Sequence, residues 1–152
     1  MPYLLLKWLH VLAAIVAVGS NVTYGIWIAR ASRSPEALPF TLRGIKLIDD
    51  RVANPAYGLL LATGLLMVFV VRLPLTTPWL LTALVLYVIV VLVGLLGYTP
   101  TLRHQIRMLD SEGFHSPNYQ ALARRGTILG LVLAVLVIVI VFLMVVKPGL
   151  WA

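Results

Sequence analysis

Residues 1–30, MPYLLLKWLHVLAAIVAVGSNVTYGIWIAR, form a nearly unbroken apolar run that is long enough to cross a bilayer as a helix. The run contains His10, the only histidine that lies inside any apolar stretch of the chain. At helical spacing, its polar and small residues share one face, which we call the polar stripe. The stripe consists of Tyr3, Lys7, His10, Ala14, Ala17, Asn21 and Tyr24. A helix with one such stripe is expected to face lipid on its apolar sides and other helices on the stripe.

The composition of the whole chain extends this interpretation. The 152 residues are 61% hydrophobic and only 11% charged, and apolar stretches of membrane-spanning length cover about 3–29, 53–71, 79–99 and 127–146. We therefore predict an all-α fold, an integral membrane four-helix bundle, in which residues 1–152 form a single membrane domain. The chain has no cysteine, which excludes disulfides, thiolate metal sites and thiol catalysis.

The basic residues predict how the bundle is oriented. Nine of the twelve Lys and Arg residues lie in the first and third connectors, and three lie on the other side. By the positive-inside rule, both connectors are cytoplasmic and both termini are extracytoplasmic, in a multi-pass protein of the inner (plasma) membrane. We expect helices 2–4 to extend into the cytoplasm, where the charged residues, Asp49 and Asp50 among them, form a solvated collar. The net charge of +7 then serves contact with the lipid bilayer, and no nucleic acid is expected as a partner.

Several local signals predict where helices start, bend and end. Pro55 and Pro100 lie inside long helical patterns and are expected to kink them, because proline lacks the backbone donor and clashes with the preceding turn. Gly113 is expected to stop the third helix, and Ser116 followed by Pro117 is a typical helix start. The second helix is expected to begin near Thr41 and to end at Arg72.

A cluster of candidate ligands follows from comparing depths along the four spans. His10, Met67 and Met144 fall at similar depths in the outer half of the bundle, with Tyr87 somewhat deeper. Imidazole and thioether groups bind haem iron or copper, so this set predicts a cofactor site for haem b or copper, with His10 as the metal ligand. The structural alternative is that the methionines fill gaps in the core and that His10 bonds to a carbonyl group or to Tyr3.

Two other interpretations of the stripe stay open. Asn21 and Tyr24 either line a small transport pathway or simply bond across helices. His104 and His115 lie on the opposite side of the bilayer from His10, so a haem with two histidines requires a homodimer that contributes His10 from each copy.

The segments LKWLHVLAAIVAVGS, NPAYGLLLATGLLMV and GYTPTLR together resemble a bacterial family of predicted four-helix integral membrane proteins of unknown function. The chain is also distantly similar to copper-resistance-D-like membrane proteins and to haem-containing protoporphyrinogen oxidases. This resemblance rests on Leu9-His10 and Gly19, and it implies a haem- or metal-linked role for His10. The second span has no lysine between Arg51 and Arg72, unlike those oxidases, which argues against an enzyme.

The sequence thus favours a non-enzymatic integral membrane protein of unknown function that binds haem or a metal through His10. A small transporter or channel, and a structural or assembly partner of another membrane complex, are the two alternatives.

Overall fold

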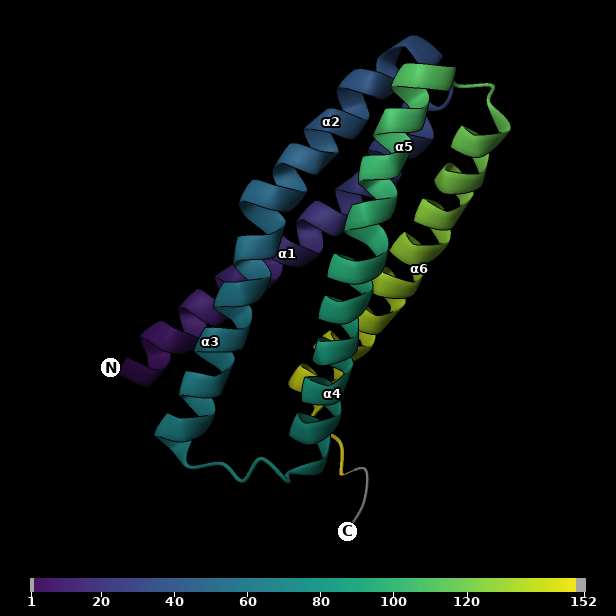
Figure 1. Ribbon diagram of the computed structural model, residues 1–152. Helices are drawn as coiled ribbons and strands as arrows, with labels where there is room; N and C mark the ends of the chain where they lie inside the picture. Colours follow the sequence, from purple (N-terminus) through teal and green to yellow (C-terminus); the bar gives the residue numbers. More distant parts are fainter. Residues whose placement is uncertain (1, 150–152) are drawn as a thin grey trace.

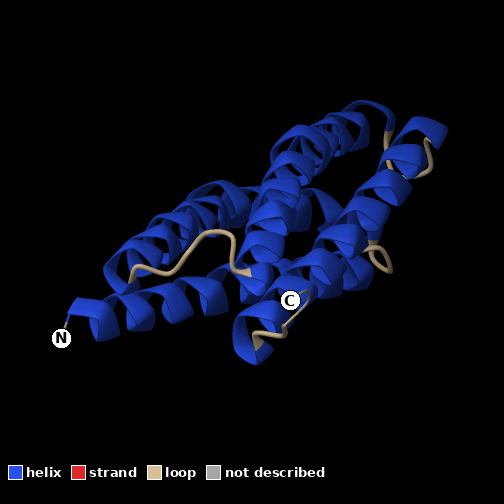
Figure 2. Cartoon of the chain, turned by 90° about the horizontal axis from the view of Figure 1, so that it is seen from below, coloured by secondary structure: helices blue, strands red, loops and turns tan. Residues whose placement is uncertain are grey.

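The computed structural model describes residues 2–149, and this part of the chain is built from helices joined by short connections (Figure 1, Figure 2). The elements are α1 (Pro2–Ala31), η1 (Pro35–Ala37), α2 (Leu38–Ile48), η2 (Asp49–Ala53), α3 (Asn54–Val71), α4 (Pro78–Leu92), η3 (Val93–Tyr98), α5 (Thr99–Glu112) and α6 (Pro117–Val146). The chain is continuously helical from η1 to α3 and again from α4 to α5, so it forms four long rods.

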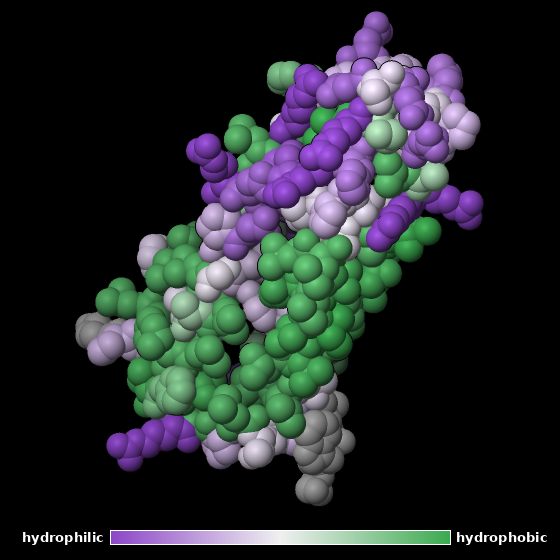
Figure 3. All heavy atoms as spheres, in the orientation of Figure 1, coloured by the Kyte–Doolittle hydropathy of each residue, from purple (hydrophilic) through white to green (hydrophobic). Residues whose placement is uncertain are grey.

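Each of these four rods is long and apolar enough to cross a membrane, which confirms the predicted multi-pass architecture within residues 2–149. Large apolar side chains remain exposed around the bundle, as expected where lipid replaces water. Figure 3 shows them as a green belt over the lower part of the molecule, and hydrophilic residues gather at the upper end. We call the upper end, formed by α2, α5 and the start of α6, the charged end. Figure 1 places the start of α1 and the end of α6 toward the other end.

The predicted helix ends are confirmed. The α3 helix ends where Arg72 adopts a left-handed backbone with φ of 55°, and α5 stops at Gly113, whose φ of 83° suits a residue without a side chain. The Ser116 hydroxyl accepts hydrogen bonds from the backbone amides of Asn118 and Tyr119, and so caps the start of α6. The second rod begins earlier than Thr41, because η1 and α2 already wind the chain from Pro35.

Both interior prolines follow a widened helical turn of the π type. The segment η2 lies just before Pro55, and η3 lies just before Pro100. A proline cannot donate a backbone hydrogen bond and crowds the turn before it, so the helix absorbs the conflict by widening. The predicted distortions are therefore present, and their form is a wide turn that shifts the phase of each helix face.

Small residues allow the rods to pack in pairs. The α1 helix packs against α3 and α4 packs against α6, with α1 and α6 also in contact. Ala17 in α1 and Ala83 in α4 are fully enclosed, as expected where helices approach through small side chains. Within the described chain, the backbones of α3 and α4 do not come close to each other, although a short connection joins the two helices.

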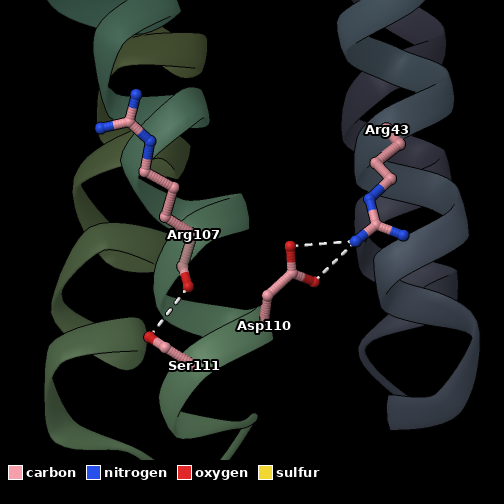
Figure 4. Close-up of polar contacts among 4 residues, drawn as sticks. All are labelled: Arg43, Arg107, Asp110 and Ser111. Carbon is pink, nitrogen blue, oxygen red and sulfur yellow. Dashed lines mark hydrogen bonds and ion pairs between the residues drawn. The ribbon is translucent and has the colours of Figure 1, made fainter.

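At the charged end, α2 and α5 lie side by side and close the bundle. Leu38, Leu42 and Ile45 of α2 are buried, and they join a core cluster that includes Leu102 and Leu109 of α5. The Arg43 guanidinium donates to both carboxylate oxygens of Asp110, at 2.8 and 2.9 Å, which ties α2 to α5 (Figure 4). Because both partners are exposed, this ion pair contributes little stability, and the apolar contacts beneath it hold the two helices together.

Candidate functional site

A cavity of about 720 Å³ lies between the four rods and is lined by residues from α1, η2, α3, α4, η3, α5 and α6. We call it the interhelical cavity. Its walls are mainly apolar, and a crevice between the two sides of the apolar belt is visible in the space-filling view (Figure 3). The polar side chains contributed by the two wide turns and the segments after them are Asp49, Asn54, Tyr98, Thr99 and Gln105. A mainly apolar pocket with a few converging polar groups is the usual form of a small-molecule site.

Asp49 is the charged group of this cavity. Its side chain is only 5% exposed, and the Thr99 hydroxyl donates a hydrogen bond to its Oδ2 at 3.3 Å. The neighbouring Asp50 is exposed and pairs with Lys46. The predicted solvated collar is therefore wrong for Asp49, because η2 turns this residue toward the inside of the bundle. A carboxylate removed from water needs hydrogen bonds or a cation to offset the loss of hydration.

Tyr24, a member of the polar stripe, lines the same cavity and carries a buried hydroxyl group. Its side chain is 4% exposed, and its hydroxyl has no hydrogen-bond partner among the residues of the described chain. Buried polar atoms without partners are rare in folded proteins, and they commonly mark a place where a bound molecule or a water completes the bond. The hydroxyl of Tyr24 therefore points to an occupant of the cavity.

Tyr57 connects three of the four rods. The Asn21 amide of α1 donates to the Tyr57 hydroxyl, and the Tyr87 hydroxyl of α4 donates to the Tyr57 backbone carbonyl. The rings of Tyr57 and Tyr87 are 6.5 Å apart between centroids, in a tilted arrangement. Because the backbones of α3 and α4 stay apart within the described residues, long side chains such as Tyr57 and Tyr87 connect the two helices.

Glycines keep the cavity open. Gly25, Gly58 and Gly94 all line it, and a side chain built at any of them meets no atom within 4 Å. These three glycines come from three different rods, and each leaves open space beside it. The volume of the cavity therefore depends on the absence of side chains at these positions. Larger residues at these positions would fill the space where an occupant would lie.

His10 lies outside this cavity and has a defined partner. Its Nδ1 is 2.9 Å from the Thr63 hydroxyl oxygen, and that hydroxyl donates its own hydrogen to the Leu59 carbonyl at 2.7 Å. With the hydroxyl hydrogen on the Leu59 carbonyl, Nδ1 carries the proton and donates to Thr63; in the other tautomer, the hydroxyl donates to Nδ1 instead. Gly64 permits the close approach, since a side chain there would come within 3.1 Å of His10 Cε1.

This arrangement is found in a chain that matches one known family model over residues 4–148. The chain belongs to the DUF2269 family of predicted integral membrane proteins. No curated protein and no solved structure matches it. The predicted membership of a four-span family of unknown function is confirmed, and the similarity to copper-resistance-D-like proteins and to protoporphyrinogen oxidases stays a prediction.

In this DUF2269 member, the four predicted cofactor residues divide between two places. His10 bonds to Thr63, whereas the Tyr87 hydroxyl bonds to Tyr57, which lies six residues or about 9 Å away along α3. Met67 lies one turn beyond Thr63 on the same face of α3, and Met144 is half-buried near the end of α6. The described residues contain no group of three or more His, Cys, Asp or Glu that could hold a metal ion.

The two residues of the transport alternative, Asn21 and Tyr24, both line the interhelical cavity. Sequence reasoning missed Asp49, Asn54, Tyr98 and Thr99 as their neighbours. A usable signal was present, since each of these residues lies within the six residues before an interior proline. Wide turns before such prolines are frequent at functional sites.

A matched pair of substitutions compares a tyrosine hydroxyl that has a hydrogen-bond partner, that of Tyr57, with one that has none in the described chain, that of Tyr24. Tyr57→Phe leaves the Asn21 amide without its partner and should lower the free energy of unfolding by about 1–3 kcal/mol. Tyr24→Phe removes a hydroxyl that has no partner, so stability should stay unchanged or rise. Reversible unfolding of the purified protein in mixed micelles measures both. Equal destabilisation by the two substitutions would show that the Tyr24 hydroxyl has a partner within the fold.

Proposed function

We propose that the protein binds a small organic molecule in the interhelical cavity and acts as a non-enzymatic binding protein or transporter of the membrane. The observation that carries this proposal is that Tyr24, whose buried hydroxyl has no partner in the described chain, lines a cavity of about 720 Å³. That volume is within the range of about 300–1,000 Å³ that is typical of small-molecule pockets.

The composition of the cavity supports a ligand rather than a packing defect. An empty apolar void would carry no buried carboxylate, because desolvating a charge is costly unless the charge is used. Here Asp49 and Thr99 come from two separate rods, and each rod carries a wide helical turn at the cavity wall. Both wide turns contribute residues to the cavity wall, and each replaces regular α-helix there. Wide turns of this kind are frequent at functional sites, which supports a binding site in the cavity.

Filling the cavity is expected to abolish binding. We expect Gly58→Phe and Gly94→Phe to place a ring in the open space, while Gly44→Phe in α2 adds the same ring away from the cavity. Saturable binding is measured by ligand-observed NMR on protein in nanodiscs, with benzyltrimethylammonium, benzyl alcohol and benzoate as probes. At least one probe should bind to the unmodified protein and to Gly44→Phe, with affinity reduced about tenfold or more in both cavity variants.

Absence of saturable binding by all three probes, or binding that neither cavity variant changes, would contradict this proposal. That outcome would favour the third role, in which the protein is a structural or assembly partner of another membrane complex. Flux of a bound probe into proteoliposomes, compared between the unmodified protein and Asn21→Leu, separates a transporter from a binding protein.

We further propose that the charged end faces the cytoplasm of a plasma-membrane protein and that both termini are extracytoplasmic. Nine of the twelve basic residues lie at or beside the charged end, which is the distribution that the positive-inside rule describes. The chain has no cysteine, so single substitutions can report topology. In intact cells, a membrane-impermeant maleimide should label Thr76→Cys and should label Ser34→Cys only after permeabilisation. The reverse pattern would invert the orientation.

A second proposal, favoured by the fixed imidazole of His10, is that this residue binds haem b or copper. Ligand histidines usually donate the hydrogen of their other ring nitrogen to a nearby acceptor, and the Thr63 oxygen lies 2.9 Å from Nδ1, in position to accept it. His10 Nε2 could then supply one ligand, with Met67 or Met144 as candidates for another, whereas the Tyr87 hydroxyl is engaged with Tyr57. A site with two histidines would need His10 from a second copy, so it would also require a homodimer.

Absorption spectroscopy after haem addition tests the haem form of this site. We expect a Soret band that is lost in His10→Ala. In Thr63→Val, the apparent affinity for haem should fall about 10- to 100-fold, because the hydroxyl that orients the imidazole is gone. His104→Ala, at an exposed position of α5, serves as the control and should leave the band unchanged. A protein that takes up no haem, or a band that survives His10→Ala, would exclude His10 as the haem ligand.

A further inference from the structure

The chemical class of the occupant can be argued from the charges around the interhelical cavity. Asp49 forms no ion pair with any residue of the described chain, since Lys46 is paired with Asp50 and Arg43 with Asp110. Its side-chain hydrogen-bond partners are neutral, namely the Thr99 hydroxyl at 3.3 Å and the side chain of Asn54. Lys46 acts on the carboxylate electrostatically but is paired with Asp50, so no cation of the described chain is in direct contact with Asp49 to offset its burial.

The residues that line the cavity carry no compensating positive charge. Among the described residues, no Lys, Arg or His belongs to the lining. An anionic ligand, such as a phosphate or a carboxylate, would meet Asp49 without a basic partner and would be repelled. A wholly apolar ligand would leave both Asp49 and the Tyr24 hydroxyl unmatched.

Four tyrosines surround the same space. Tyr24, Tyr57, Tyr87 and Tyr98 all line the cavity, and Asp49 lines it with them. The faces of aromatic rings attract cations, and groups of such rings are the usual receptors of quaternary and protonated amines. A carboxylate beside several tyrosine rings thus combines the two elements that recognise an organic cation.

We propose that the interhelical cavity binds an organic monocation that carries a protonated or quaternary amine, with its charge between the Asp49 carboxylate and the surrounding tyrosine rings. The cavity has room for a molecule of drug-like size, and its apolar walls suit a hydrocarbon body attached to the amine. Where the amine carries a proton, the Tyr24 hydroxyl accepts its N–H and gains the partner that it lacks. This inference rests on the proposed ligand-binding function and adds the charge of the ligand to it.

The decisive comparison uses two probes of the same shape on the unmodified protein in nanodiscs of zwitterionic lipid. Benzyltrimethylammonium carries the charge, and neopentylbenzene replaces the charged nitrogen by carbon. Equilibrium dialysis, corrected with empty nanodiscs, should show that the cation binds at least about tenfold more tightly than its neutral isostere. Equal affinities, or no binding of the cation, would overturn the proposal.

Variants then locate the charge that is recognised. Asp49→Asn keeps the size of the side chain, so it should reduce the affinity for benzyltrimethylammonium about tenfold or more and leave that for neopentylbenzene unchanged. Asp50→Asn is the matched control, because it removes an equivalent carboxylate that is exposed and lies outside the cavity lining. An effect of Asp50→Asn as large as that of Asp49→Asn would assign the preference to the general charge of the region.

The outcomes separate this inference from the function on which it rests. If both probes bind equally and Gly94→Phe abolishes the binding of both, then the cavity is a ligand site and only its preference for cations is wrong. If neither of these two probes binds, and benzyl alcohol and benzoate do not bind either, both proposals fail. If Asp49→Asn does not fold, the unmodified protein still tests the proposal, because it should prefer benzyltrimethylammonium to neopentylbenzene. The Gly94→Phe variant should lose this preference.

Discussion

The burial of one carboxylate, Asp49, is the constraint from which the rest of the site follows. Asp49 is 5% exposed beside spans that are almost wholly apolar, and its side-chain hydrogen-bond partners, Thr99 and Asn54, are both neutral. A charge in such a place must be matched, so the surrounding structure supplies tyrosine rings, polar side chains and an internal space. The cavity, the wide turns and the open seam between α3 and α4 are then parts of one arrangement around this group.

The wide turns explain how a residue of the charged end reaches the interior. In a regular α-helix, each residue advances the face by about 100°, so one extra residue in a turn rotates everything beyond it. The segment η2 introduces such a shift between α2, whose Leu42 packs against α5, and α3, whose Tyr57 packs toward α1 and α4. The same device in η3 directs Tyr98 and Thr99 toward Asp49. Each of these two rods therefore packs against different helices at its two ends while it stays continuously helical.

Much of the fold could be predicted from the sequence because it depends on local or additive properties. The four spans follow from apolar length, and the ends at Arg72, Gly113 and Ser116 follow from backbone preferences of single residues. The site could be predicted only in part. Asn21 and Tyr24 lie on a regular helix, so their shared face could be extrapolated. The position of Asp49 could not, because the extrapolation assumed an unbroken helical phase that η2 interrupts. The sequence indicated a helix distortion near Pro55, but it did not indicate which residues the distortion would turn toward the inside of the bundle.

The polar stripe of α1 shows how the same helix face carries both partnered and unpartnered groups. Its residues His10 and Asn21 meet Thr63 and Tyr57, so α3 satisfies them by hydrogen bonds across the helix pair. Tyr24 lies one turn further on the same face, near the point where the wide turn η2 carries the second rod away from a regular path. Its hydroxyl is the stripe member that is left buried without a partner in the described chain. Had the stripe served only to hold α1 against α3, a phenylalanine at position 24 would have packed as well and would have avoided the cost of burying a hydroxyl. The retention of that hydroxyl at the wall of a charged cavity therefore argues that this end of the stripe contacts something other than the chain itself.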